Sequence, residues 1–159
     1  MRNKLWILSI GIIVSMMMVA CDGNMIFEEN QTVENQVWSS DDIKSFSFDV
    51  TDTISPVSIA INLRTTVDYP YSNIYMFLYS EYPDGTSNKD TLEFVLAASD
   101  GKWHGENSGT VVSFQGYIAA GGRFAKPGTY TYKLQHAMRE DELPEIVDVG
   151  ILVETMEEE

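Results

Sequence analysis

A two-residue hydrophobic period runs through most of the chain from Val37 onward, and it constrains the fold more than any other feature. The alternation is clear over residues 46–50, 57–64, 129–134 and 147–153. Successive side chains of a strand point to opposite faces, so this pattern indicates strands with one buried face. After the N-terminal apolar segment, no stretch keeps a 3.6-residue apolar period over three turns. The pattern therefore predicts a β protein.

Turn residues divide the chain into about seven strands. Asp100-Gly101 and Lys126-Pro127-Gly128 are typical of tight turns between strands. Residues 74–79 are continuously apolar, which predicts a central strand covered on both faces. Only residues 137–143 suggest a short helix, ended by Pro144. We expect an all-β fold, an antiparallel β-sandwich of jelly-roll type.

The first twenty residues have the pattern of an export signal. Arg2 and Lys4 precede an apolar run of 16 residues, 5–20. A membrane-spanning helix needs about 20 apolar residues, and a shorter run with basic residues before it is typical of a signal peptide. The run ends in Met18-Val19-Ala20-Cys21, which resembles a lipobox with Met in the place of the usual Leu.

The lipobox resemblance implies a specific chemistry at Cys21. The sulfur carries a diacylglycerol, the chain is cut between Ala20 and Cys21, and the new amine carries a further acyl chain such as palmitate. Cys21 is the single cysteine, so it has no intrachain disulfide partner. Two or three acyl chains hold a protein firmly, because each buried methylene contributes about 0.8 kcal/mol. The alternative is an uncleaved N-terminal anchor helix with an incidental cysteine.

These assignments predict four segments. They are a signal peptide over 1–20, a polar lipidated tether over 21–36, a β-sandwich domain over 37–155 and an acidic tail over 156–159. We expect a lipid-anchored protein of the cell envelope. Because Asp22 alone follows the cysteine, without a dense acidic cluster, we favour the periplasmic face of the outer membrane over the cell surface.

The charge excludes one class of partner. Removal of Arg2 and Lys4 changes the formal net charge from −14 to −16. Nucleic-acid binding needs Lys and Arg to displace counterions, so no nucleic-acid partner is expected. The same charge disfavours adsorption to anionic lipid headgroups. Membrane attachment is therefore assigned to the lipid anchor.

A search for reactive groups predicts no catalytic residue, no metal and no cofactor. His136 lies in phase with the inward residues of its strand, so we expect a buried, hydrogen-bonded structural histidine, whereas His104 lies in a loop. No hydrolase, nucleotide-binding or zinc-protease motif occurs. The loop over 84–90 offers oxygen ligands for Ca²⁺, but its spacing matches no EF-hand and a plain turn is favoured. The chain is not expected to be an enzyme.

Several further residues have two interpretations each. Six aromatic residues either stack on sugar rings or fill the core, and the core is favoured: Tyr69, Tyr71, Tyr75, Tyr79, Tyr82 and Trp103. Thr53 and Thr91 each follow an aspartate in a short pattern that resembles the O-glycosylation sequon of exported Bacteroidetes proteins. Arg64 lies on the outward phase of its strand, where a carboxylate such as Asp68 is a partner. Gly150, inside a strand, marks a bulge or a close backbone approach.

Segments along nearly the whole mature chain resemble one family when taken in order. Two of these segments are Tyr69-Pro70-Tyr71 and Gly101-Lys102-Trp103-His104-Gly105. The full set consists of residues 62–64, 69–75, 90–91, 101–105, 127–130, 136–139, 143 and 147–150. The chain resembles the GldH family of gliding-motility lipoproteins of Bacteroidetes. The resemblance implies a non-enzymatic envelope lipoprotein associated with gliding motility and type IX secretion components.

Two functions remain open at this point, with a hydrolase well behind them. The first is a structural or assembly role that depends on envelope protein partners. The second is glycan binding by a surface or periplasmic lipoprotein. An exposed aromatic platform in a groove favours the second, and a flat apolar patch or a long unpaired edge strand favours the first.

Overall fold

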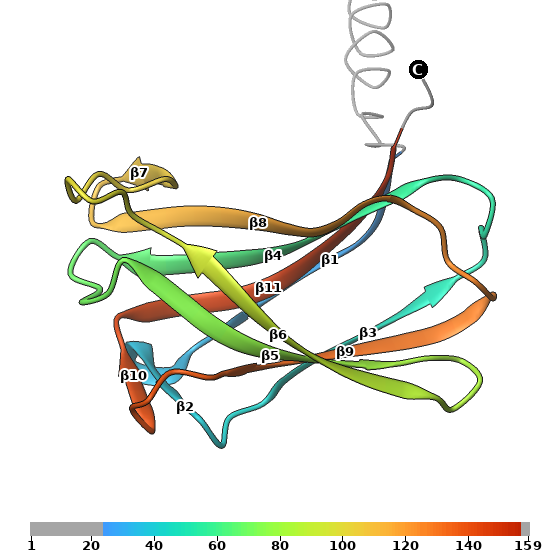
Figure 1. Cartoon of the computed structure of the whole chain (residues 1–159), viewed down its shortest axis with the longest axis horizontal. Coiled ribbons are helices and arrows are strands. Elements are labelled where there is room, and N and C mark those ends of the chain that lie inside the picture. Colours follow the sequence, from blue (N-terminus) through green and yellow to red (C-terminus); the bar gives the residue numbers. More distant parts are fainter. Residues whose placement is uncertain (1–23, 157–159) are drawn as a thin grey trace, which may run out of the picture.

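The chain folds as a long hairpin that is rolled into two packed antiparallel sheets (Figure 1). The computed structural model describes residues 24–156. The elements are β1 (Met25–Thr32), η1 (Glu34–Gln36), β2 (Val37–Ser39), β3 (Lys44–Val50), β4 (Val57–Thr66), β5 (Asn73–Glu81), β6 (Ser87–Val95), β7 (Glu106–Ser108), β8 (Val111–Gly122), β9 (Gly128–His136), β10 (Glu142–Pro144) and β11 (Ile146–Thr155).

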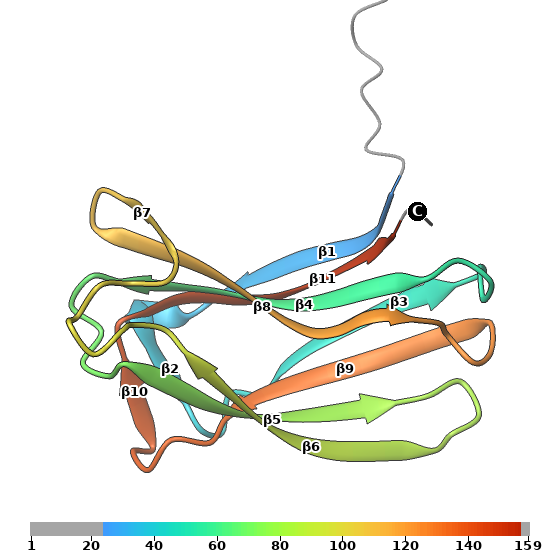
Figure 2. The same ribbon diagram turned by 45° about the horizontal axis from the view of Figure 1, so that its top comes forward.

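The strand pairs are nested, as in a hairpin. β1 pairs with β11, β3 with β9, β4 with β8 and β5 with β6. Two further pairings, β11 with β4 and β9 with β5, roll this hairpin into a five-stranded sheet β1-β11-β4-β8-β7 and a four-stranded sheet β3-β9-β5-β6. This is the jelly-roll order, so the predicted all-β antiparallel sandwich of jelly-roll type is confirmed. Figure 2 shows the two layers from a second direction.

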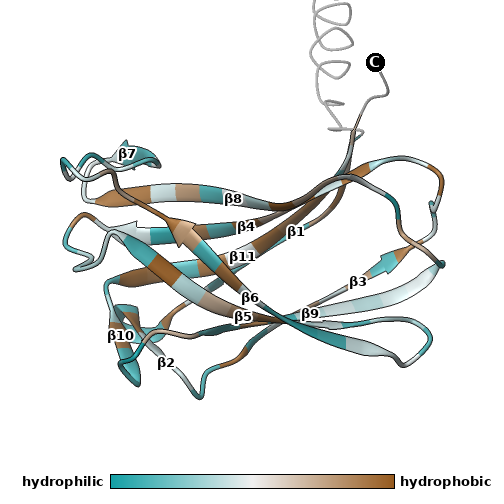
Figure 3. Ribbon diagram, viewed as in Figure 1, coloured by the Kyte–Doolittle hydropathy of each residue, from teal (hydrophilic) through white to brown (hydrophobic). Residues whose placement is uncertain are grey.

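The core lies between the two sheets and contains the residues that the alternation assigned to it. Phe46, Ile61, Leu134 and Ile151 are almost completely buried. Figure 3 shows hydrophobic residues along β4 and β11 and hydrophilic residues in the loops around β7 and β10. β11 is buried on both faces over residues 148–153, because side chains of the two neighbouring strands cover its outer face, as Asn30 of β1 does at Gly150 and Arg64 of β4 does at Asp148. Burial of this apolar surface is the main source of stability.

The predicted number of about seven strands is too low. The described residues contain eleven strands: eight form the jelly roll, and β2, β7 and β10 are short additions of three residues each. Short edge strands need partners for their backbone groups but few apolar side chains, so they lack the alternation on which the prediction depended.

The domain begins before Val37, because β1 occupies most of the segment predicted as a tether. β1 pairs with β11 from Met25 to Thr32, and the ring of Phe27 stacks on Phe48 at 5.1 Å between centroids. Its other side chains are mostly polar because β1 is an edge strand with one solvated face. The predicted signal peptide, Cys21 and the last three residues of the predicted tail lie outside the described residues.

Two local predictions are wrong. β5 is not covered on both faces, because Ile74, Met76 and Leu78 are buried whereas Tyr75 is exposed. Residues 137–143 form no helix; they make bends and then enter β10, which pairs with β2. Within residues 24–156, no helix has the length and apolar character to cross a membrane.

Candidate functional site

The outer face of the five-stranded sheet carries a polar hollow of about 590 Å³. The strand register places Asn30, Gly150, Asn62 and Gln115 side by side across this face. The Asn30 side chain lies over Gly150, where a Cβ would stand 2.0 Å from Asn30 Oδ1. We call this site the amide hollow, and its lining residues are Glu28, Asn30, Asn62, Leu63, Arg64, His104, Gly105, Glu106, Ser113, Phe114 and Gln115.

Hydrogen bonds connect the polar side chains of the amide hollow. Gln115 Nε2 donates to Asn62 Oδ1 at 2.9 Å, and the Tyr117 hydroxyl donates to Gln115 Oε1 at 3.3 Å. The amides of Asn62 and Asn30 both donate to Glu28 Oε1 at 3.4 Å. A side-chain amide has two donor hydrogens and an accepting oxygen, so each retains capacity for another partner. The site therefore presents alternating donors and acceptors.

An ion pair holds one rim of the amide hollow. Arg64 is half-exposed, and its Nε donates to Asp148 Oδ2 at 2.7 Å while Nη2 also contacts that oxygen. Asp148 is 2% exposed, and its Oδ1 has no hydrogen bond within residues 24–156. The hydrogen bond that Arg64 donates to Asp148 raises the pKa of Arg64. The guanidinium is thus fixed over a buried carboxylate.

The prediction that Arg64 pairs with Asp68 is wrong, because Arg64 pairs with Asp148. The register between β4 and β11 places Asp148 directly opposite Arg64. Asp68 lies in the turn after β4, where its backbone N–H donates to the Thr66 hydroxyl at 3.2 Å. Local sequence distance suggested Asp68, whereas sheet pairing selects a residue 84 positions later in the chain.

One wall of the amide hollow is the loop that leads into β7. His104 is exposed in this loop, as predicted. The loop lies close to β8, since a Cβ on Gly105 would stand 2.4 Å from the Ser113 carbonyl oxygen. A glycine is required for this close approach. Glu106, the first residue of β7, pairs with Ser113 and completes the wall.

The outer face of the four-stranded sheet carries a different surface, a row of aromatic side chains. Tyr75, Phe77 and Tyr79 point outward from β5, and we call them the aromatic row. Lys89 of β6 lies with its Nζ 3.7 Å from the Phe77 ring centroid and 4.9 Å from that of Tyr79. Within the described chain, β6 pairs with β5 alone, so its other edge is open.

The six aromatic residues weighed for glycan stacking do not form one platform. Tyr69 is buried, its hydroxyl donates to the Asn73 carbonyl at 3.1 Å, and burial raises its pKa. Tyr82 and Trp103 pack against the core. Tyr71 donates to Glu140 and lines a small hollow together with Tyr75, whereas Tyr79 is not part of that hollow. Tyr117, which alternation alone did not distinguish, is the most exposed aromatic residue between positions 24 and 156, at 56%.

The two predicted O-glycosylation threonines lie far apart in the fold. Thr53 is half-buried in the loop between β3 and β4, where Asp52 Oδ1 accepts the backbone N–H groups of Ile54 and Ser55. Hydrogen bonds from Ser55 and Ile54 lower the pKa of Asp52. Thr91 is exposed on β6, opposite Phe77. Modification of either residue stays a prediction, and so does acylation of Cys21.

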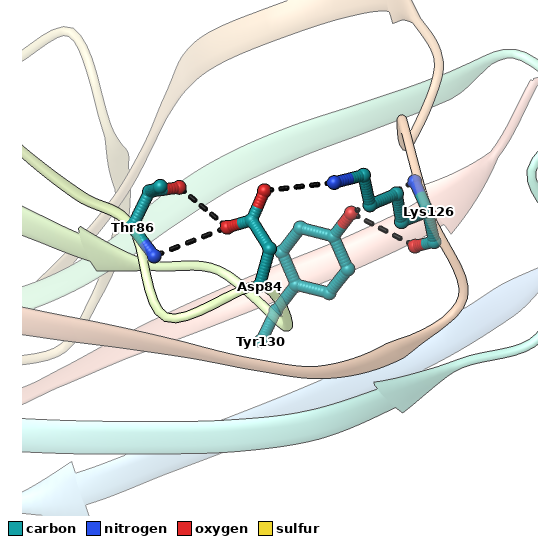
Figure 4. A network of polar contacts seen from close by, with 4 residues as sticks. All are labelled: Asp84, Thr86, Lys126 and Tyr130. Atoms are coloured by element: carbon teal, nitrogen blue, oxygen red, sulfur yellow. Dashed lines mark hydrogen bonds and ion pairs between the residues drawn. The ribbon is translucent and has the colours of Figure 1, made fainter.

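In the loop considered for Ca²⁺, the carboxylate oxygens of Asp84 are already engaged by other residues of the protein (Figure 4). Asp84 Oδ1 accepts from the Thr86 N–H at 3.1 Å and hydroxyl at 2.5 Å, and Asp84 Oδ2 contacts Lys126 Nζ at 2.9 Å. Thr86 and Lys126 lower the pKa of Asp84. The Tyr130 hydroxyl donates to the Lys126 carbonyl at 2.9 Å. This network ties the β5–β6 hairpin to the β8–β9 loop.

No metal-binding constellation appears among residues 24–156. The Asn88 amide donates to Asp90 Oδ2 at 2.7 Å, so these two candidate ligands are engaged with each other rather than with Asp84. No group of three or more His, Cys, Asp or Glu side chains in this part of the chain has a geometry that could hold a metal ion.

His136 is buried, as predicted, but without the predicted hydrogen bonds. Its side chain is almost completely inaccessible and packs edge-on against Trp38, with 5.4 Å between ring centroids. Neither ring nitrogen has a hydrogen bond of normal geometry in the described structure, although backbone groups of Asp141 and Trp38 lie near enough to the ring to oppose the effect of burial on its pKa. Burial lowers the pKa of His136, so the imidazole is held in its neutral form.

Comparisons with known proteins identify relatives along almost the whole domain. A family model described as GldH lipoprotein matches residues 25–153. The gliding motility lipoprotein GldH homolog of Christiangramia forsetii is 29% identical over 142 residues, which cover 85% of this chain and 86% of that protein. The gliding motility lipoprotein GldH of Flavobacterium johnsoniae is 27% identical over 150 residues, which cover 90% and 92%.

The comparison with solved structures gives only weak similarities. A chain of infectious bursal disease virus, Gx strain, aligns with 84% of this chain at 14% identity and a TM-score of 0.34, and this chain spans 30% of its length. A similarity at that level has no bearing on function.

Proposed function

The chain belongs to the GldH lipoprotein family, and on this basis we propose a non-catalytic, lipid-anchored protein of the cell envelope that takes part in assembling a gliding-motility or type IX secretion apparatus. Two similar proteins carry gliding motility in their names. In the described residues, no hydrogen bond joins the Ser113 hydroxyl of the amide hollow to His104 or Glu106, which line the same hollow. The role proposed here therefore depends on binding.

The start of β1 sets how the domain meets the membrane. If Cys21 carries the lipid, three residues lie between it and Met25, and the four steps from one Cα to the other span at most about 14 Å. β1 begins where β11 ends, beside the loop between β3 and β4. The exposed apolar side chains at this end are Met25 at 47%, Ile54 at 81% and Met156 at 40%. We propose that this end rests on the periplasmic face of the outer membrane.

The observation that carries the proposed protein-binding role is the aromatic row beside the open edge of β6. β6 is nine residues long, and its outer backbone groups face no other strand in the described residues. An open edge of this length accepts an added strand, and aromatic residues are enriched at protein interfaces. Lys89, Asp90 and Glu93 on β6 limit indiscriminate pairing, as charges do on other edge strands.

Photo-crosslinking in living cells of the native host tests this role. A photoreactive residue is placed at Thr91 on β6 and, as the matched control, at Ser113 on the opposite sheet; both positions are exposed. We expect Thr91 to capture envelope proteins of the motility or secretion machinery, and a Phe77→Ser variant to reduce that capture. Capture of the same proteins from Ser113, or no loss in Phe77→Ser, would contradict the proposal.

The anchor is tested separately. Inhibition of the lipoprotein signal peptidase should cause the precursor to accumulate, and the mature protein should carry acyl mass at Cys21. A Cys21→Ala protein that still partitions with membranes would show that the anchor lies elsewhere, irrespective of what β6 binds.

A further inference from the structure

We propose that the amide hollow binds a neutral, hydroxyl-rich oligosaccharide, with Tyr117 as the stacking surface. This goes beyond the proposed assembly role, and it concerns the sheet opposite the aromatic row. The inference rests on four properties of the site: its shape, its hydrogen-bonding groups, its charge and the position of an exposed ring.

The shape follows from the residues in the middle strands. The row that crosses the hollow has Gly150 on β11 between Asn30 and Asn62. The next row places Ala60 between Leu152 and Tyr117. The Asn30 side chain covers Gly150, and the hollow is bordered by Glu28 and Asn30 of β1 on one side and by residues 104–106 on the other. A volume of about 590 Å³ lies in the range of about 300–1,000 Å³ that small-molecule sites occupy.

The hydrogen-bonding groups suit neighbouring hydroxyls. Each sugar hydroxyl both donates and accepts, and the side chains of Asn30, Asn62 and Gln115 offer both functions in one line. The bonds from Asn30 and Asn62 to Glu28 are long, at 3.4 Å, and a ligand hydroxyl can replace them. Polar groups that lose water on binding need new partners, which a polyol supplies and an apolar ligand does not.

The charge selects a neutral ligand. Glu28 and Glu106 line the hollow, and the full chain carries a formal net charge of −14, so an anionic sugar would be repelled. The Arg64 guanidinium on the rim is paired with Asp148 and does not reverse this balance.

The exposed ring extends the site beyond one sugar. Tyr117 is 56% exposed, and its hydroxyl contacts Gln115 of the amide hollow. A second hollow of about 450 Å³ also borders Tyr117, and it is lined by Ser58 and Glu154 and by Asn24 and Met156 at the end proposed to face the membrane. The sugar chain is therefore assigned to the amide hollow and Tyr117. An aromatic ring with an apolar face and a polar edge stacks on a pyranose ring, so a chain of several sugars fits this arrangement.

A peptide fits the site less well. Peptides add to the edges of sheets or place apolar side chains in apolar pockets. The amide hollow lies on a sheet face, and most of its lining side chains are polar. We therefore assign this face to carbohydrate and the β6 edge to protein.

The test uses the full-length lipidated chain in nanodiscs and saturation-transfer NMR. The probes are maltopentaose, cellopentaose and mannopentaose, with trigalacturonate as the acidic control. We expect signal transfer to at least one neutral probe and none to trigalacturonate. Asn62→Ala and Tyr117→Ala should each weaken binding at least tenfold, whereas Tyr75→Ala on the other sheet should leave it unchanged.

A further variant guards against loss of folding. Ser113 is exposed in the hollow, so Ser113→Phe fills the space without removing any amide or disturbing the core. It should abolish binding while the melting temperature stays that of the parent protein. Absence of transfer to all three neutral probes, equal transfer to trigalacturonate, or undiminished binding by Ser113→Phe would each overturn the assignment. None of these outcomes affects the crosslinking result expected at β6.

Discussion

The guanidinium of Arg64 covers the carboxylate of Asp148, which lies beneath it on the neighbouring strand. Arg64 is 51% exposed and Asp148 is 2% exposed, so one member of the pair meets water and the other does not. The second carboxylate oxygen has no hydrogen bond among the described residues. Asp148 therefore depends on Arg64 for compensation of its charge, and this asymmetry makes the pair sensitive to loss of the arginine.

Replacement of Arg64 by alanine should destabilise the domain by about 2–3 kcal/mol. Removal of one partner from a fully buried pair costs about 3–5 kcal/mol, and the exposure of Arg64 reduces that figure because water reaches the site. Lys133→Ala is the matched control, since Lys133 and Glu81 are both exposed and such pairs contribute about 0–1 kcal/mol. Urea unfolding followed by tryptophan fluorescence measures both; equal losses would contradict the buried role of Asp148.

Gly150→Ala should separate β1 from the sheet. A Cβ at this position would lie 2.0 Å from Asn30 Oδ1 and 2.4 Å from the Glu29 carbonyl oxygen, and that carbonyl belongs to the paired backbone of β1. We expect a loss of about 1–3 kcal/mol, as for other overpacked sites, and faster hydrogen exchange along β1. Gly122→Ala, which meets no atom within 4 Å, is the control and should be neutral. Unchanged exchange in β1 would refute the close approach.

The sequence predicted the long strands of the sandwich, β1 excepted, better than the surfaces on them. Phe46, Phe48 and Val50 alternate and are buried, because a strand with one face on a core has to carry apolar residues at every second position. β1 was missed because an edge strand is specified by its partner: seven of its residues pair with β11, more than a hundred positions away. Local alternation contains no signal for such a pairing.

The same limit applies to the amide hollow. Asn62 and Gln115 are ordinary outward residues of two strands, and Glu28 was assigned to a tether. Only the register of β1, β11, β4 and β8 brings them together. Gly150 was the one local signal, since a glycine inside a strand indicates a close approach, and the structure shows that approach at Asn30.

Burial of His136 should make the stability depend on pH near neutrality. Burial lowers its pKa below 6.5, so as the pH falls through 6.5 the unfolded chain takes up a proton that the folded chain does not. The unfolded state then binds more protons, and the free energy of unfolding decreases with falling pH, by at most about 1.4 kcal/mol per pH unit for one proton. The contribution is fully present above pH 6.5.

Urea unfolding at pH 7.5, 6.5 and 5.5 measures this dependence. His136→Leu should flatten the slope between pH 6.5 and 5.5, because the replaced side chain does not titrate. His104→Gln, which removes the exposed histidine, should leave the slope of the parent protein. The same slope in His136→Leu as in the parent would mean that the buried imidazole is not its source.

The short connection between the predicted lipid and β1 leads to a prediction about orientation. β11 has ten residues and spans about 33 Å at the rise of a strand, so the two ends of the sandwich lie at very different heights above a bilayer if one end is held within about 14 Å of it. In nanodiscs with paramagnetic lipid headgroups, the amide signals of Ile54 and Met156 should broaden strongly. Those of Asp68 and Thr110, near the other ends of β4 and β8, should not. Insertion of a twelve-residue Gly-Ser segment between Asn24 and Met25 should remove the difference, because the domain is then free to tumble. Equal broadening at both ends of the parent protein would show that the domain lies flat on the membrane.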